Sequence, residues 1–178
     1  MTATTIDALK EALPDYAKDI RLNLSNVIKE DPNSGLSLNQ VHGIALAAAY
    51  TTKNPTVISA VQGETAATLS PEEVNAAKAA SSIMAMNNVY YRSAYMTQDD
   101  EFSKMPAGLR MNVIASPGID KLTFELYSLA VSAINGCGAC VQSHASAVQH
   151  GNLPKQAVQH TFKIAAVLAS AAQAISIA

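Results

Sequence analysis

Apolar residues recur every three to four positions along most of this chain, which is the spacing of one face of an α-helix. Alanine and other helix-forming residues dominate, whereas the alternating runs of β-branched residues that form strands are missing. The pattern therefore predicts an all-α fold. The predicted helices cover residues 7–12, 16–30, 38–52, 71–95 and 120–134, and two more begin after Asn54 and at Cys137.

Local capping signals mark where several of these helices begin. Ser70 and Glu73 have the spacing of a capping box, in which each side chain bonds the backbone N–H of the other residue. Asn54 followed by Pro55 has the form of an N-cap and a first helical residue. Residues 105–118 contain two prolines and two glycines, so this segment is predicted to be an irregular connection between two halves.

The second half of the sequence resembles the first at a spacing of about 83 residues. Residues 47–57 align with residues 130–140, and each half reads as helix, tight turn, helix, turn and long helix. We predict one all-helical domain over residues 1–178, in which a helix-hairpin unit is duplicated at about 38–97 and 120–178. A chance alignment of alanine-rich helices is the alternative. If the repeat is real, only its second copy carries cysteines.

Composition narrows the function classes. Charged residues make up 15% of the chain, against about 25% in ordinary globular domains, so either an oligomer covers part of the surface or alanine-rich helices pack tightly. The net charge is −2 without a basic run, so a nucleic-acid partner is not expected. The most apolar stretch, residues 164–178, is too short to span a membrane. Residues 1–5 lack the pattern of a signal peptide, which makes the cytoplasm the expected location.

The chain contains two cysteines, Cys137 and Cys140, separated by two residues. On a helix such a pair has its Cα atoms roughly 5–5.5 Å apart, so either a disulfide or an open dithiol is within reach. In the cytoplasm a Cys-x-x-Cys pair is more often catalytic or metal-binding than a permanent structural bridge. Zinc is the less favoured interpretation, because it needs four ligands and this segment offers at most two sulfurs and one nitrogen.

The residues around the cysteines indicate redox chemistry. Gly136 interrupts the preceding helix, which places Cys137 at the start of the next one, where unpaired backbone N–H groups stabilise a thiolate. His144 shares a helical face with both cysteines, so its imidazole can approach the Cys140 sulfur and take or give a proton. Glu125 sits in an apolar stretch and is either on an exposed stripe or held inward for a purpose.

The other histidines are expected to have lesser roles. His150 precedes Gly151, the predicted C-cap of its helix, where an imidazole favours the negative end of the helix dipole. His160 is predicted to face either the site or solvent, and His42 to lie on a helix surface. Packing rather than a cofactor site is predicted for Met84, Met86, Tyr90, Tyr91 and Tyr95.

Several longer segments resemble one known family. They are residues 13–20, 84–92 and 108–118, then Phe124-Glu125-Leu126, and residues 133–144. Together they closely resemble the alkyl hydroperoxide reductase D proteins, over nearly the whole chain. The Cys-x-x-Cys-x-x-x-His element alone is shared with the wider carboxymuconolactone-decarboxylase-like superfamily, whereas the flanking segments are specific to the family.

The resemblance implies an all-helical, internally duplicated fold assembled as a homotrimer. It implies weak peroxidase activity on organic hydroperoxides, and reduction of a partner peroxiredoxin with electrons from a dihydrolipoyl protein, without a bound cofactor. Carried over by position, Cys140 would be the sulfur that becomes sulfenic acid, and Cys137 the proton donor and resolving thiol. Glu125 and His144 would form the proton relay, which favours the inward position for Glu125.

One position departs from the family pattern. Family members often carry a histidine directly before the second cysteine, whereas this chain has Ala139. Thiol–disulfide exchange does not need that histidine, so the sequence predicts competent exchange with weak peroxide reduction. Two other hypotheses stay open: a decarboxylase- or isomerase-like enzyme that makes no redox use of its thiols, and a helical interaction module without catalytic activity.

Overall fold

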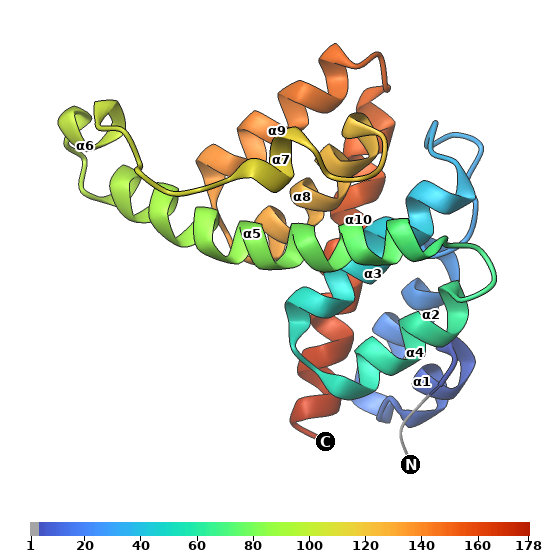
Figure 1. The fold of residues 1–178 in the computed structure, drawn as a ribbon. Coiled ribbons are helices and arrows are strands. Elements are labelled where there is room, and N and C mark those ends of the chain that lie inside the picture. Colours follow the sequence, from blue (N-terminus) through green and yellow to red (C-terminus); the bar gives the residue numbers. More distant parts are fainter. Residues whose placement is uncertain (1–3) are drawn as a thin grey trace.

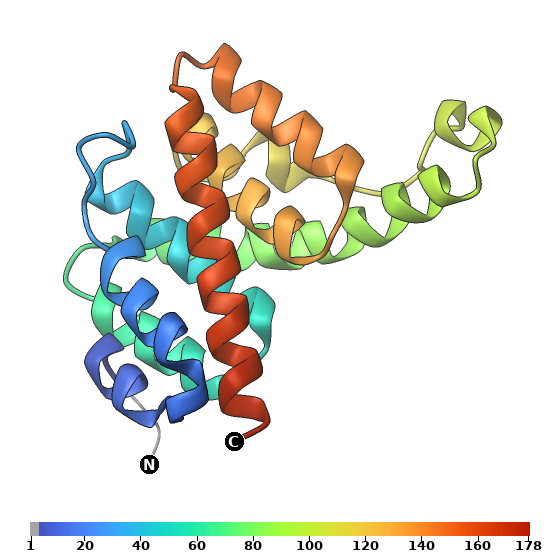
Figure 2. The ribbon, with the colours of Figure 1, turned by 180° about the vertical axis from the view of Figure 1, so that it is seen from behind.

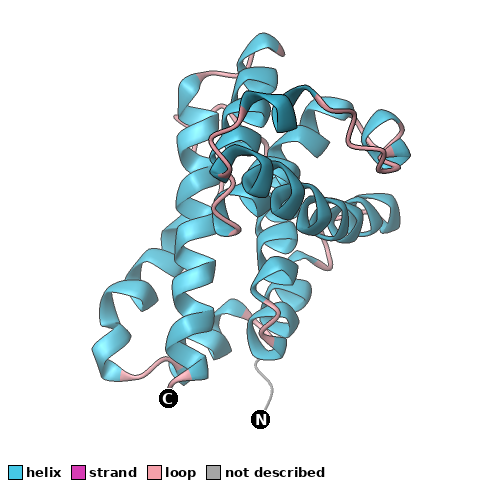
Figure 3. Cartoon of the chain, turned by 90° about the vertical axis from the view of Figure 1, so that its left-hand side faces the viewer, coloured by secondary structure: helices cyan, strands magenta, loops and turns pink. Residues whose placement is uncertain are grey.

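The computed structural model of the protein describes residues 4–178 and folds them into helices joined by loops, without a strand in this range (Figure 3). In chain order the elements are α1 (Ile6–Ala12), the 3₁₀ turn η1 (Asp15–Ala17), α2 (Lys18–Val27), α3 (Leu38–Thr52), α4 (Pro55–Thr65), α5 (Pro71–Met96), α6 (Asp100–Lys104), α7 (Asn112–Ala115), α8 (Lys121–Ile134), α9 (Gly138–His150) and α10 (Lys155–Ser176). The predicted all-α fold is confirmed, while the duplication of a helix-hairpin unit stays a prediction. Within the same range, no helix is long and apolar enough to cross a membrane.

The capping signals in the sequence are confirmed. Ser70 and Glu73 form the capping box at the start of α5, and the Asn54 side chain accepts hydrogen bonds from the first turn of α4. A further capping box, between Ser37 and Gln40, starts α3. Because these signals act within one helical turn, α4 and α5 begin where the sequence indicated.

The predicted helix 16–30 is wrong in its bounds, because a 3₁₀ turn precedes α2 and the helix ends at Val27. His160 accounts for the end, since its Nε2–H donates to the Val27 carbonyl across 3.0 Å. At the start, the Tyr16 hydroxyl donates to the Ala174 carbonyl of α10 across 3.2 Å. Contacts with a distant helix therefore help to fix both ends of α2. His160 is buried in making its contact, so the prediction that it faces the site or solvent is wrong too.

Two helices form the centre of the molecule. α10 runs along its length and packs against α2, α3, α4 and α8 (Figure 2). α3 is buried along most of its length, and its alanines let neighbouring helices approach closely. At Gly43 of α3, a Cβ atom would overlap the Tyr127 hydroxyl of α8. The close packing of α3 on α8 therefore requires glycine at this position.

His42 lies inside this packing, so the prediction of a surface position is wrong. The residue is 7% exposed, and every residue from Val41 to Ala49 is buried. Burial lowers the pKa of His42, and the charge of Glu64 and a hydrogen bond with the Ile28 backbone partly oppose that effect. The physical reason is that α3 is apolar on all sides, so the helix has no polar face to turn toward water.

Residues 89–109, called the projecting arm, comprise the C-terminal end of α5, α6 and the loop that follows, and the part of the arm beyond Arg92 stands away from the rest of the chain (Figure 1). The chain turns near Gln98, forms α6 and returns through a loop to α7, which packs on α8. The connection predicted for 105–118 is therefore irregular apart from the single turn of α7. Large apolar side chains are exposed on the arm, namely Val89, Tyr91, Tyr95, Met96, Phe102, Met105 and Leu109.

Candidate active site

The two cysteines lie where α8 ends and α9 begins. Asn135 caps α8, and Gly136 reverses the chain with a φ of +67°, which favours glycine. Cys137 is the N-cap of α9, and its sulfur accepts a hydrogen bond from the Cys140 N–H across 3.4 Å. The two Cα atoms are 5.3 Å apart, and a disulfide joins the residues. Residues 135–140 are called the cysteine turn below.

The two cysteines differ in their access to solvent. Cys137 is 0% exposed, whereas Cys140 is 7% exposed and lines a cavity of about 320 Å³. Side chains from α5, α8, α9 and the α7 segment also line this cavity, namely Met84, Asn87, Tyr91, Met111, Ile114, Glu125, Ala139, Ser143, His144 and Ala147. Of the two cysteines, Cys140 is therefore the one that a molecule in this cavity, called the reaction cavity below, can reach.

Glu125 and His144 meet on the wall of the reaction cavity. Oε2 of Glu125 lies 2.6 Å from Nδ1 of His144. An ionised carboxylate only accepts hydrogen bonds, so Nδ1 carries the hydrogen and Nε2 is the nitrogen left for proton exchange. Nε2 lies 3.3 Å from the Met84 sulfur, and Cys140 lines the same cavity. The structure thus brings the residues singled out in the sequence into one place, with Glu125 turned inward.

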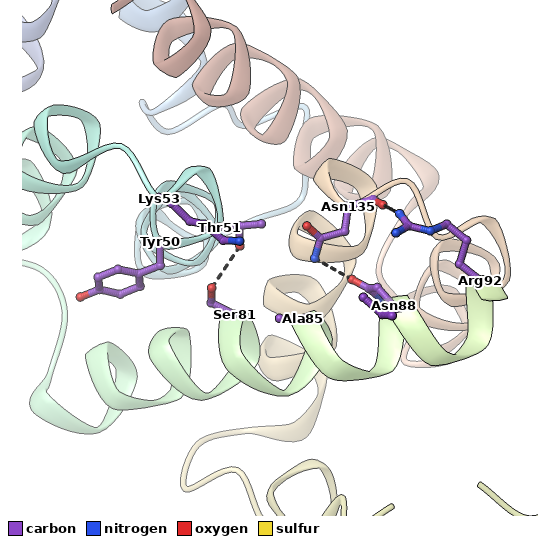
Figure 4. Close-up of a pocket in the computed structure, with 9 residues that line it drawn as sticks. Tyr50, Thr51, Lys53, Ser81, Ala85, Asn88, Arg92 and Asn135 are labelled. Carbon is purple, nitrogen blue, oxygen red and sulfur yellow. Dashed lines mark hydrogen bonds between the residues drawn. The ribbon is translucent and has the colours of Figure 1, made fainter. Parts of the chain in front are cut away.

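A hydrogen-bond network from α5 holds the cysteine turn (Figure 4). The fully buried Asn88 donates to the Ser132 hydroxyl across 2.9 Å and accepts from the Asn135 side chain across 3.0 Å. Arg92, one turn further along α5, donates to the Asn135 carbonyl. Each bond joins α5 to the end of α8, so the network positions the segment that leads directly into Cys137.

Sequence reasoning missed this network and one contact of the site. Asparagine is a weak helix former, so the adjacent pair Asn87-Asn88 in the middle of a long helix was a usable signal for tertiary contacts. Met84 packs in the core, as predicted, but its sulfur also touches His144. In the part of the chain that the structure describes, no three His, Cys, Asp or Glu side chains are grouped to hold a metal ion.

The segment that carries the cysteine pair matches a known family of proteins. Residues 100–178, which contain the cysteine turn, match the model of the Carboxymuconolactone decarboxylase family. Relatives that match nearly the whole chain bear the name alkyl hydroperoxide reductase AhpD.

Three of these relatives give the extent of the match. The protein of Coxiella burnetii (strain RSA 493) is 51% identical over 168 residues, covering 94% of this chain and 95% of its own. The protein of Streptomyces coelicolor is 49% identical over 164 residues, covering 92% and 90%. The protein of Azorhizobium caulinodans is 47% identical over 174 residues, covering 98% and 94%. The chain belongs to the alkyl hydroperoxide reductase AhpD family, and the resemblance stated from the sequence is confirmed.

Proposed function

We propose that this protein is an alkyl hydroperoxide reductase whose reacting groups are the thiols of Cys137 and Cys140. One observation carries the proposal: the disulfide-bonded pair caps α9 beside a cavity that also holds the Glu125–His144 pair. The names of the relatives support the same activity. The substrate class is an organic hydroperoxide, whose alkyl group suits a cavity lined by methionine, isoleucine and alanine.

The proposed reaction begins at Cys140, since this cysteine lines the cavity. Its thiolate attacks the terminal oxygen of the hydroperoxide, so an S–O bond forms, the O–O bond breaks and Cys140 becomes a sulfenic acid. His144, held by Glu125, supplies a proton to the departing alkoxide. The Cys137 thiol then attacks the Cys140 sulfur, which forms the disulfide and releases water. In total two thiols and one hydroperoxide give one disulfide, one alcohol and one water.

The proposed exchange with other proteins also uses Cys140. A dithiol donor attacks the accessible sulfur, forms a mixed disulfide there, and leaves Cys137 and Cys140 reduced after a second exchange. By family resemblance the donor is a dihydrolipoyl protein, and the acceptor of the electrons is a partner peroxiredoxin. Ala139 carries no proton donor into the cavity that it lines, so peroxide reduction should be slower than reduction of the peroxiredoxin.

A homotrimer in the cytoplasm completes the proposal. The apolar side chains exposed on the projecting arm support burial against further copies of the chain, and the low charge content points the same way. Light scattering of the purified protein measures the mass directly. A mass that stays at that of one chain would contradict the trimer without touching the proposed chemistry.

Mass spectrometry of the thiols tests the function. Reduced wild-type protein treated with cumene hydroperoxide should lose two hydrogens as the disulfide closes. The variant Cys137→Ser should instead stop at a sulfenic acid on Cys140, which dimedone traps, and Cys140→Ser should consume no hydroperoxide. Ser82→Ala, on the exposed face of α5, is the control. Thiols that stay unchanged in the wild type would favour the helical interaction module without catalytic activity. A catalytic activity that survives Cys140→Ser would favour the decarboxylase- or isomerase-like enzyme.

A further inference from the structure

Asn87 has a buried side chain whose Oδ1 has no hydrogen-bond partner in the described part of the chain. The residue is 4% exposed, and no group in the described part of the chain donates to its Oδ1. The neighbouring Asn88 is equally buried, but both ends of its carboxamide are paired. A buried carbonyl that lacks a donor costs stability, so its presence calls for a ligand or another function.

The side chain of Asn87 lines the reaction cavity. It lies on α5, one turn after Met84, whose sulfur contacts His144. Cys140 and the Glu125–His144 pair line the same cavity from α9 and α8. The carboxamide is therefore on the wall of the space where the reacting oxygens must lie, although its Oδ1 is sealed from that space, and it is the only carboxamide among the residues that line this cavity.

We propose that Asn87 binds and orients the O–O–H group of the hydroperoxide, an inference that rests on the proposed function. The carboxamide supplies a donor to this group, because its Nδ2–H donates to the oxygen that bears the alkyl group. As the O–O bond breaks, negative charge grows on that alkyl-bearing oxygen. The Nδ2–H bond strengthens at this stage, so it contributes most in the transition state.

Asn87 thereby separates the two half-reactions of the protein. A disulfide or a thiol has no O–H group and offers sulfur, which is a weak hydrogen-bond acceptor. Exchange between Cys140 and a dithiol donor therefore gains little from the carboxamide. Loss of Asn87 should affect peroxide reduction selectively, which a merely structural residue would not do.

The experiment uses Asn87→Leu, which keeps the approximate size of the side chain, and Asn87→Ala as a second variant. Two rates are measured on the full chain: consumption of cumene hydroperoxide by the reduced protein, and reduction of the disulfide by dihydrolipoamide. We expect kcat/KM for cumene hydroperoxide to fall about ten- to hundredfold. The dihydrolipoamide rate should stay within about twofold, because this step makes no use of the carboxamide. Ser82→Ala on the exposed face of α5 is the control for both rates.

Each outcome is informative. Wild-type protein that does not consume the hydroperoxide overturns the proposed function itself. Active wild-type protein with an unchanged kcat/KM in Asn87→Leu overturns the role of Asn87 alone. Parallel losses in both rates, or unfolding of both variants, assign Asn87 to the structure and overturn the inference as well. A thermal midpoint of Asn87→Leu at or above that of the wild type supports it, since the variant removes an unpaired buried polar group.

Discussion

Asn88 allows a direct test of how the fold holds the cysteine turn. Its buried side chain donates to the Ser132 hydroxyl and accepts from the Asn135 side chain. The substitution Asn88→Ala removes both hydrogen bonds and leaves both partners unpaired. Because Asn135 lies two residues before Cys137, the loss loosens the segment that positions this cysteine.

The size of the effect follows from the burial of the two partners. Ser132 is fully buried, so losing its partner costs about 1–3 kcal/mol of unfolding free energy. Asn135 is partly exposed and can bond to water, so its loss costs about 1 kcal/mol or less. We therefore expect Asn88→Ala to lower the unfolding free energy by about 1–4 kcal/mol in total.

The assay is urea unfolding of wild type and variant, each with the disulfide intact and with both cysteines reduced. A disulfide forms most easily when the fold already holds its two sulfurs together, so a looser turn should destabilise the oxidised form more than the reduced form. By a thermodynamic cycle, the difference between the two losses moves the reduction potential of the pair to a less negative value. The conversion is about 30 mV for each 1.4 kcal/mol.

Equal losses in the oxidised and the reduced protein would refute the argument that this network serves the cysteine turn. A loss below about 1 kcal/mol in both forms would refute the hydrogen-bond energies on which it rests. Ser82→Ala, on the exposed face of the same helix, should leave both stabilities and the potential unchanged.

Three further predictions concern single side chains. Tyr127 is fully buried, and its hydroxyl has no hydrogen-bond partner in residues 4–178. Tyr127→Phe should therefore raise the unfolding free energy by about 1 kcal/mol and the thermal midpoint by about 2–4 °C. A lower thermal midpoint would contradict this prediction. Burial lowers the pKa of His42, so below about pH 6.5 the unfolded chain binds a proton more readily than the folded chain does. The unfolding free energy should therefore fall as the pH drops below about 6.5, by up to about 1.4 kcal/mol per pH unit. Measured by urea unfolding between pH 7 and pH 5, the unfolding free energy should change less with pH in His42→Leu than in the wild type. Equal pH dependence in the two proteins would contradict the role of His42. Glu125→Gln weakens the partner of His144 and should slow sulfenic acid formation in the Cys137→Ser background about a hundredfold, measured by dimedone trapping; an unchanged rate would exclude the relay.

Helix positions were readable from the sequence wherever the deciding interactions are local. Leu38–Thr52 and the starts of α4 and α5 follow from caps and helix formers within a turn of each other. The bounds of α2 were not readable, because His160 competes for the Val27 carbonyl from far along the chain. His42 was misjudged for a related reason, since its burial depends on helices that cover α3 from several sides.

In the candidate site too, local features were predictable from the sequence and contacts between helices were not. The positions of Cys137, Cys140 and His144 follow from helical geometry and one glycine, so their common location was predictable from spacing. Glu125 stayed ambiguous on chemistry alone, because its partner lies on another helix. Asn88, whose partners are on α8, was missed because the sequence does not reveal which helix faces which.

The course of α10 bears on how the protein is made. During synthesis the N-terminal part of a chain leaves the ribosome first, so α2, α3 and α4 emerge well before the helix that covers them. In a nascent chain that still lacks residues 155–176, these apolar faces are exposed to water, where they can aggregate or bind chaperones. The core can therefore close only after α10 itself has left the ribosome, because α10 packs against helices that are made before it.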